Sequence, residues 1–135
     1  DVDGSDAAHK LAILAQIAFG VAPRPADIER RGIDAVDAMD IRFADELGYT
    51  VKLLAEAWSG SGGDGGKTRL SSGTGTVTGT VALHVAPVLL RKTDMLAQVR
   101  GAFNAVQVVG DAVGETLFQG PGAGMMPTAS SVVGD

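Results

Sequence analysis

Hydrophobic residues near the beginning of the chain recur at the spacing of an α-helix. Positions i, i+3, i+4 and i+7 share a face, and they are occupied by Leu11, Leu14, Ala15 and Ala18. Ser5 or Asp6 can cap the start of this helix, and Gly20 can end it. Because Ile13 and Ile17 make the remaining side apolar too, we expect neighbouring structure to enclose the helix on most sides.

Eight shorter elements are expected further along the chain. Apolar residues that alternate with polar ones, or that turn-forming residues bound, predict strands at 28–33, 49–58, 74–85, 103–109 and 115–119. Helical spacing and acidic caps predict a helix from Asp37 or Asp40 to Leu47, a short turn or helix at 93–96, and a last helix at 126–133. Glycine and serine dominate residues 59–73, which we expect to form a loop.

The order of these elements favours an α+β fold. Strands joined by turns rather than by helices indicate a mostly antiparallel or mixed sheet with helices packed on one face. The other face then needs cover, and a second copy of the chain is the simplest partner, so we expect a homodimer. The 135 residues suffice for one domain with its own core, over residues 1–135.

Composition and charge exclude several classes of function. The net charge is −5, and the basic residues are scattered along the chain, which argues against nucleic acid as a partner. No apolar run approaches the roughly 20 residues that span a bilayer, so no membrane segment is expected. The chain contains no cysteine, which excludes thiol nucleophiles and is compatible with a cytoplasmic location. His9 and His84 lack the spacing of metal ligands, and no metal site is expected.

Two glycine-rich motifs raise the question of phosphate binding. Gly66-Lys67-Thr68 resembles the end of a phosphate-binding loop, but Ser61 stands where that motif requires glycine, so a surface loop is favoured. The turn Gly120-Pro121-Gly122-Ala123-Gly124 lies between a predicted strand and a predicted helix, as a dinucleotide fingerprint does. The fingerprint fails at Met125. Two interpretations stay open, a tight turn and a turn whose amide groups face a cofactor held by another domain.

Acidic residues and a lysine gather around the start of the first helix. Asp6 and Lys10 are four residues apart, and an ordinary ion pair is the simplest explanation. If the apolar helix is enclosed, however, Lys10 is half-buried, and a lysine there can exchange protons near neutral pH. Asp1 and Asp3 precede the helix and can either hold a substrate ammonium group or merely face solvent.

Four segments in register resemble homoserine dehydrogenases. The segment at residues 1–14 is similar to that family's signature D-x-x-G-x-D-A-x-x-K-x-x-I-L, and residues 40–49 are similar to its I-x-x-A-x-x-L-G-Y segment. Phe103-Asn104-Ala105-Val106 with residues 110–114 resembles F-N-A-V…G-D-A-V-G, and residues 120–130 resemble G-P-G-A-G-x-x-P-T-A-S. The resemblance therefore extends over the whole chain.

This resemblance implies NAD- or NADP-linked interconversion of L-homoserine and L-aspartate 4-semialdehyde, a step toward threonine, methionine and isoleucine. Lys10 matches the lysine that handles the proton of the substrate oxygen. Asp6 matches the acid that positions substrate and lysine, and Asp1 matches an acid near the substrate amino group. Gly122 and Gly124 match the glycine turn that approaches the nicotinamide nucleotide.

The same resemblance implies that the NAD(P)-binding domain of the family is absent from this chain. We therefore expect the 135 residues alone to be inactive. Two alternatives remain at this point. The chain can be a dimerisation module in which Asp6 and Lys10 are merely structural, or a reductase for a different small acid.

Overall fold

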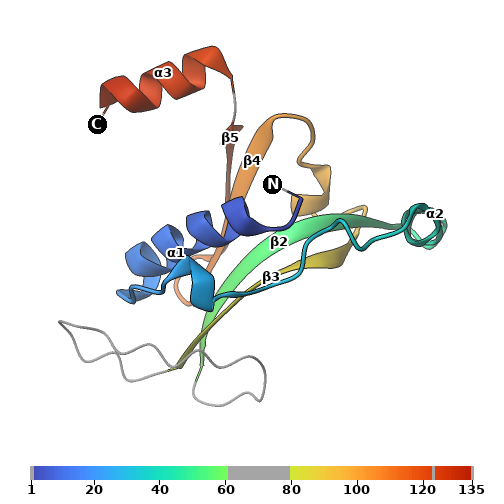
Figure 1. Cartoon of the computed structure of the whole chain (residues 1–135), viewed down its shortest axis with the longest axis horizontal. Coiled ribbons are helices and arrows are strands. Elements are labelled where there is room, and N and C mark those ends of the chain that lie inside the picture. Colours follow the sequence, from blue (N-terminus) through green and yellow to red (C-terminus); the bar gives the residue numbers. More distant parts are fainter. Residues whose placement is uncertain (1, 61–79, 123, 135) are drawn as a thin grey trace.

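The structure is a computed structural model that describes residues 2–60, 80–122 and 124–134 (Figure 1). In chain order the elements are α1 (Ser5–Phe19), the 3₁₀ turn η1 (Pro25–Asp27), β1 (Glu29–Arg30), α2 (Ala38–Glu46), β2 (Tyr49–Gly60), β3 (Thr80–Arg91), the 3₁₀ turn η2 (Leu96–Gln98), β4 (Phe103–Gly110), β5 (Gly114–Pro121) and α3 (Met125–Gly134). Within the described residues, no helix combines the length and the apolar character needed to span a membrane. The predicted α+β fold is confirmed.

A three-stranded mixed sheet forms the centre of the molecule, in the order β1-β3-β2. The long strands β2 and β3 pair antiparallel along their whole length, from Tyr49 opposite Arg91 to Gly60 opposite Thr80. β1 adds two residues in parallel, with Glu29 opposite His84. The sheet is therefore mixed, which is one of the two arrangements that the sequence predicted.

Strand β3 continues to Arg91, six residues beyond the predicted end at Val85. Pro87 lies within it, although proline is usually excluded from central strands because it lacks an N–H donor. β1 pairs with β3 only at His84 and Val85, so one side of β3 carries no partner strand at Pro87. The first part of the predicted strand, 74–79, and the loop beyond Gly60 lie outside the described residues.

The hydrophobic core lies between α1 and one face of this sheet. α1 contributes Ala8, Leu11, Ala12 and Ala15, and β3 contributes Val81, Leu83 and Val85, none of them more than 8% exposed. Small residues on the helix and branched residues on the strand let the two backbones approach closely. This contact fixes the position of α1 on the sheet.

α1 itself has the predicted bounds but not the predicted surroundings. Gly20 ends it in the left-handed conformation, as expected, whereas the N-cap is Gly4 rather than Ser5 or Asp6. The prediction that α1 is enclosed on most sides is wrong, because Ile13 and Ile17 are 61% and 77% exposed. Only one side of α1 meets the sheet, and within the described chain its other side faces outward.

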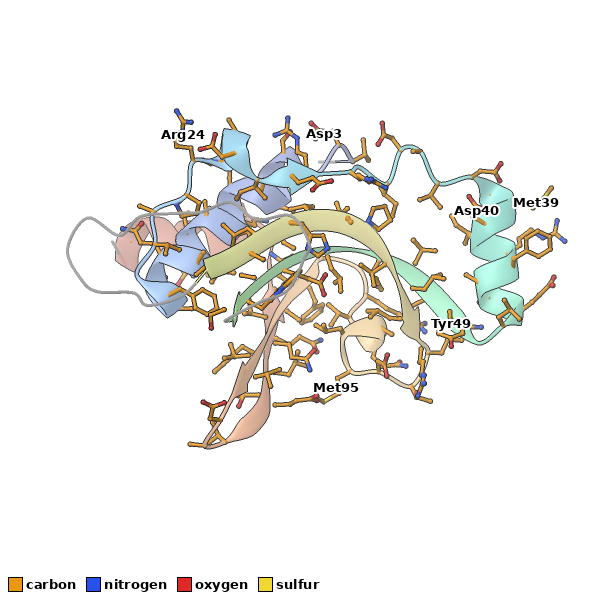
Figure 2. The ribbon with its side chains drawn as sticks, turned by 90° about the horizontal axis from the view of Figure 1, so that it is seen from below. Asp3, Arg24, Met39, Asp40, Tyr49 and Met95 are labelled. Carbon is orange, nitrogen blue, oxygen red and sulfur yellow. The ribbon has the colours of Figure 1, made fainter. Side chains whose placement is uncertain are left out.

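The remaining elements lie around this centre. α2 begins with a capping box in which Asp37 accepts the Met39 N–H and Asp40 accepts the Asp37 N–H, and it packs against β2. β4 and β5 form a separate antiparallel hairpin, which lies on the opposite side of the central sheet from α1 (Figure 2). α3 stands apart from α1 in Figure 1. The strands of the predicted sheet are thus divided between two sheets.

Candidate functional site

Asp6 and Lys10 form an ion pair at the start of α1. The Lys10 Nζ lies 2.8 Å from the Asp6 Oδ2, one helical turn away. The hydrogen bond from Lys10 lowers the pKa of the Asp6 carboxyl below its ordinary value near 3.8, with a smaller contribution from the charge of Lys10. Asp6 is therefore a carboxylate at neutral pH, and it holds the ammonium group in one direction relative to the helix.

The prediction that Lys10 is half-buried is wrong for this chain. The Lys10 side chain is 56% exposed and that of Asp6 is 51% exposed. Because α1 buries only its Ala8–Leu11–Ala15 side, a residue at position 10 lies on the outer side of the helix, the side that also carries the exposed Ile13 and Ile17. The ammonium is thus open to any molecule that approaches this end of α1.

The turn before α1 is ordered by Asp3, whose carboxylate accepts hydrogen bonds from both the hydroxyl and the backbone N–H of Ser5. The Ser5 hydroxyl contributes most to lowering the pKa of Asp3, followed by the Ser5 N–H. This orients the loop that leads to Asp6. Asp1, the other acid that the sequence pointed to, lies outside the described residues.

The glycine turn after β5 is a second, separate feature. The Gly122 N–H donates to the Ala102 carbonyl at 2.8 Å, and a side chain at position 122 would overlap the carboxamide of Asn104. Gly124 has a φ of 132°, and α3 begins at the next residue. Close packing against Asn104 explains why position 122 is a glycine. The other interpretation, a turn that faces a cofactor, stays a prediction, because the start of a helix favours an anionic group.

The structure brings Asp6 and Lys10 together and keeps the Gly122–Gly124 turn apart from them. α1 packs against β2, β3 and η1, and the helix that follows the glycine turn is separate from α1 in Figure 1. The predicted site residues therefore form two groups. The first is a charged pair exposed at the start of α1, and the second lies between β5 and the start of α3.

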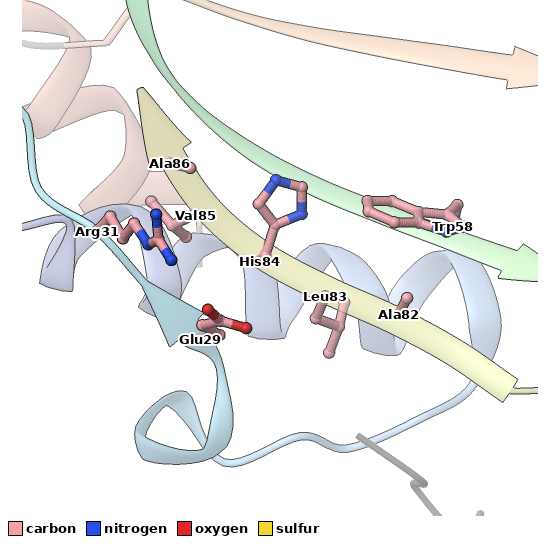
Figure 3. Close-up of a pocket in the computed structure, with 8 residues that line it drawn as sticks. All are labelled: Glu29, Arg31, Trp58, Ala82, Leu83, His84, Val85 and Ala86. Atoms are coloured by element: carbon pink, nitrogen blue, oxygen red, sulfur yellow. The ribbon is translucent and has the colours of Figure 1, made fainter. Parts of the chain in front are cut away.

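A third cluster, which the sequence did not indicate, lies on the sheet face away from α1. The His84 Nε2 is 3.1 Å from the Glu56 Oε2. The Trp58 ring meets the His84 ring edge-on with centroids 5.2 Å apart, and Figure 3 shows these two side chains. His84 and Trp58, but not Glu56, line a pocket of about 280 Å³ together with Glu29 and Arg31. The register of β2 on β3 brings Glu56 and Trp58 to His84, and the parallel pairing of β1 with β3 brings Glu29 there. No local motif could reveal these contacts.

These observations define an α+β domain that presents an exposed carboxylate–ammonium pair at a helix start and a glycine turn before a second helix. The homoserine dehydrogenase family model matches residues 1–135. The chain therefore belongs to the homoserine dehydrogenase family, and the resemblance seen in the sequence is confirmed.

Several relatives show the extent of the match. Homoserine dehydrogenases from Synechocystis sp. and Pseudomonas aeruginosa are 44% and 45% identical over all 135 residues. A solved homoserine dehydrogenase from Thiobacillus denitrificans superposes with a TM-score of 0.82 at 43% identity, and one from S. aureus with a TM-score of 0.79 at 38%. The chain is covered completely in each case, but it spans only 27–29% of these proteins.

Proposed function

We propose that this chain is the substrate-binding and catalytic domain of an NAD(P)-dependent homoserine dehydrogenase that interconverts L-homoserine and L-aspartate 4-semialdehyde in the cytoplasm. One observation carries the proposal: the Lys10 ammonium is held 2.8 Å from the Asp6 carboxylate at an exposed helix start, in a chain of this family. A small amino acid with one reacting oxygen matches such a pair.

The chemistry assigns a separate task to each residue. During reduction of the aldehyde, Lys10 donates a proton to the carbonyl oxygen as it becomes an alcohol oxygen, and in oxidation it accepts that proton. Asp6 keeps the ammonium oriented toward the substrate, and Asp1 binds the substrate amino group. A bound nicotinamide cofactor would supply the hydride for reduction of the carbonyl carbon and take it up in the reverse reaction.

The cofactor is bound mainly by a domain outside this chain. The contribution of residues 120–124 is limited to backbone near Gly122 and Gly124 at the start of α3, a place where amide groups and the helix dipole favour an anion. The preference for NAD or NADP then resides elsewhere. Because the chain spans little more than a quarter of its relatives, we expect the 135 residues alone to show no turnover.

The exposure of Lys10 fits a site that this chain forms together with a cofactor-binding domain. In the complete protein, the neighbouring domain and the substrate would cover the start of α1 and remove water from around Lys10 and Asp6. Removal of water strengthens the attraction between charged groups, so the pair gains its catalytic environment only on assembly.

Lys10→Ala in a full-length protein that carries this chain tests the proposal. We expect turnover of L-homoserine to fall by at least a hundredfold, because proton transfer by a positioned group contributes about 10²–10⁴-fold. Folding, judged by circular dichroism, and binding of the cofactor remain as in the unsubstituted protein. Normal turnover of Lys10→Ala would leave the pair a structural role only.

A dimerisation module is the second candidate, and it is compatible with the first. The sheet face away from α1 exposes 46% of Trp58 beside the His84–Glu56 pair, whose side chains are 32% and 40% exposed, an arrangement suited to a second copy of the chain. Trp58→Glu should raise the dimer dissociation constant at least tenfold in sedimentation velocity. Ile17→Glu, on the outer side of α1, is the control. Dissociation by Ile17→Glu alone would place the interface elsewhere.

A further inference from the structure

The turn of residues 2–4, which precedes α1, is held by residues 31–33, about 30 residues further along the chain. The Arg31 N–H donates to the Val85 carbonyl of β3 at 2.8 Å, and the Ile33 N–H donates to the Val2 carbonyl at 2.8 Å. The residues on either side of Gly32 are thus tied to two different parts of the molecule. Through them, the position of residue 32 is fixed between the sheet and the turn.

Gly32 leaves no space for a side chain on the side that faces this turn. A Cβ atom at position 32 would lie 2.6 Å from the Val2 carbonyl oxygen and 2.8 Å from the Asp3 Cα. Both distances are far below van der Waals contact, and both atoms belong to the backbone, so no side-chain rotation can relieve the overlap. The Asp34 carboxylate, which would also be overlapped, can rotate away.

The other side of the turn rests on the sheet. Gly4 adopts a left-handed conformation with a φ of 80°, and a Cβ there would lie 3.2 Å from the Val85 Cγ1. The Gly4 carbonyl then accepts the first helical hydrogen bond, from the Ala8 N–H at 3.0 Å. The turn of residues 2–4 is therefore confined between Gly32 and β3, and α1 begins directly from it.

We propose that Gly32 is a positioning residue for the Asp6–Lys10 pair, an inference that rests on the proposed function of that pair. Gly32 touches neither charged group. It acts through the backbone of Val2 and Asp3, which sets where α1 starts and hence where the Asp6 carboxylate lies. A displacement of the turn by the length of a methyl group moves this carboxylate relative to any substrate held by the rest of the site.

The test compares two glycine-to-alanine substitutions in a full-length protein that carries this chain. Gly32→Ala should lower kcat/KM for L-homoserine at least tenfold at 25 °C, because misplacement by about 1 Å can cost on the order of a hundredfold. The dissociation constant of the nicotinamide cofactor should not change. Gly60→Ala is the matched control, because a Cβ there meets no atom of the described residues within 4 Å, and its activity should equal that of the unsubstituted protein.

The outcomes separate this inference from the proposed function. A folded Gly32→Ala protein with normal kcat/KM would overturn the inference, and so would equal losses in cofactor affinity and turnover, which indicate general destabilisation. Lys10→Ala is assayed in parallel. If it turns over normally, the proposed function fails by itself, and an inactive Gly32→Ala protein would then show that Gly32 does not act through the Asp6–Lys10 pair.

Hydrogen exchange of the unsubstituted protein tests the same contact if Gly32→Ala does not fold. We expect the Ile33 amide, which donates to the Val2 carbonyl, to exchange at least a hundredfold more slowly than an unprotected amide, together with the Ala8 amide, which donates to the Gly4 carbonyl. Exchange at the rate of an unprotected amide would show that the segment around Gly32 does not hold the turn, and the inference would be wrong.

Discussion

Substitution of Asp6 by asparagine separates catalysis from stability at the proposed site. Asparagine keeps the size and shape of the side chain and removes its charge. In the structure the Asp6 carboxylate lies 2.8 Å from the Lys10 ammonium, and both side chains are exposed. The two roles of Asp6, a helix-surface ion pair and a positioning acid, predict effects of very different size.

The structural role is small. An exposed ion pair at i,i+4 stabilises a helix by about 0.3–0.5 kcal/mol. An acid in the first turn adds roughly 0.3–1 kcal/mol by its interaction with the helix dipole. Asp6→Asn should therefore reduce the free energy of unfolding by no more than about 1.5 kcal/mol. If Asp6 orients both Lys10 and substrate, we expect a hundredfold loss of kcat/KM, which corresponds to about 2.7 kcal/mol.

The assay follows the absorbance of the reduced nicotinamide with L-homoserine as substrate, in parallel with thermal unfolding of the same preparation. Asp27→Asn is the matched control, because Asp27 also pairs with a basic residue on the surface, with its Oδ2 2.7 Å from the Arg24 Nε. It should leave kcat/KM unchanged. The reasoning is refuted if Asp6→Asn loses no more activity than Asp27→Asn.

Three further predictions concern pH and stability. Because the pKa of Asp6 is lowered in the folded chain, its contribution to stability is present above its ordinary pKa near 3.8 and is lost as pH falls through the folded pKa. The free energy of unfolding, measured between pH 5 and pH 2, should show this loss. Asp6→Asn should make the dependence of this free energy on pH less steep. Leu83→Ala, at a residue only 2% exposed, should cost about 2–5 kcal/mol in urea unfolding, whereas Leu89→Ala on the same strand, 59% exposed, should cost about 0.5 kcal/mol or less. Asp37→Ala removes the cap of α2 and should cost about 1 kcal/mol by the same measurement, and no change would refute the role of the capping box.

Local chemistry made much of the fold predictable from the sequence. Gly20 and Gly48 end the first two helical segments because glycine adopts the left-handed conformation at low cost, and both have a positive φ here. Asp37 and Asp40 mark the start of α2 because both carboxylates satisfy free backbone N–H groups. The Asp6–Lys10 pair was equally accessible, since a spacing of four residues on a helix brings the two groups together by itself.

Contacts between distant segments could not be predicted in this way. An apolar residue such as Ile17 has the same sequence pattern whether a neighbour covers it or not, so the surroundings of α1 were predicted wrongly. The meeting of Glu56 with His84 depends on the register of two strands joined by a long connection. The contact of Gly32 with Val2 joins residues 30 positions apart, and a single glycine in a polar segment gives no signal of it.

Chemical rescue of Lys10→Ala tests most directly whether an ammonium group at this position transfers the proton. In a full-length protein carrying the substitution, small primary amines are added and reduction of L-aspartate 4-semialdehyde, the direction in which Lys10 donates the proton, is followed. We predict that turnover is lost without amine and returns in proportion to the concentration of protonated methylamine, but not of tetramethylammonium, which carries charge without a transferable proton. Full turnover of Lys10→Ala without any amine, or equal rescue by both cations, would contradict the proton-transfer role of Lys10.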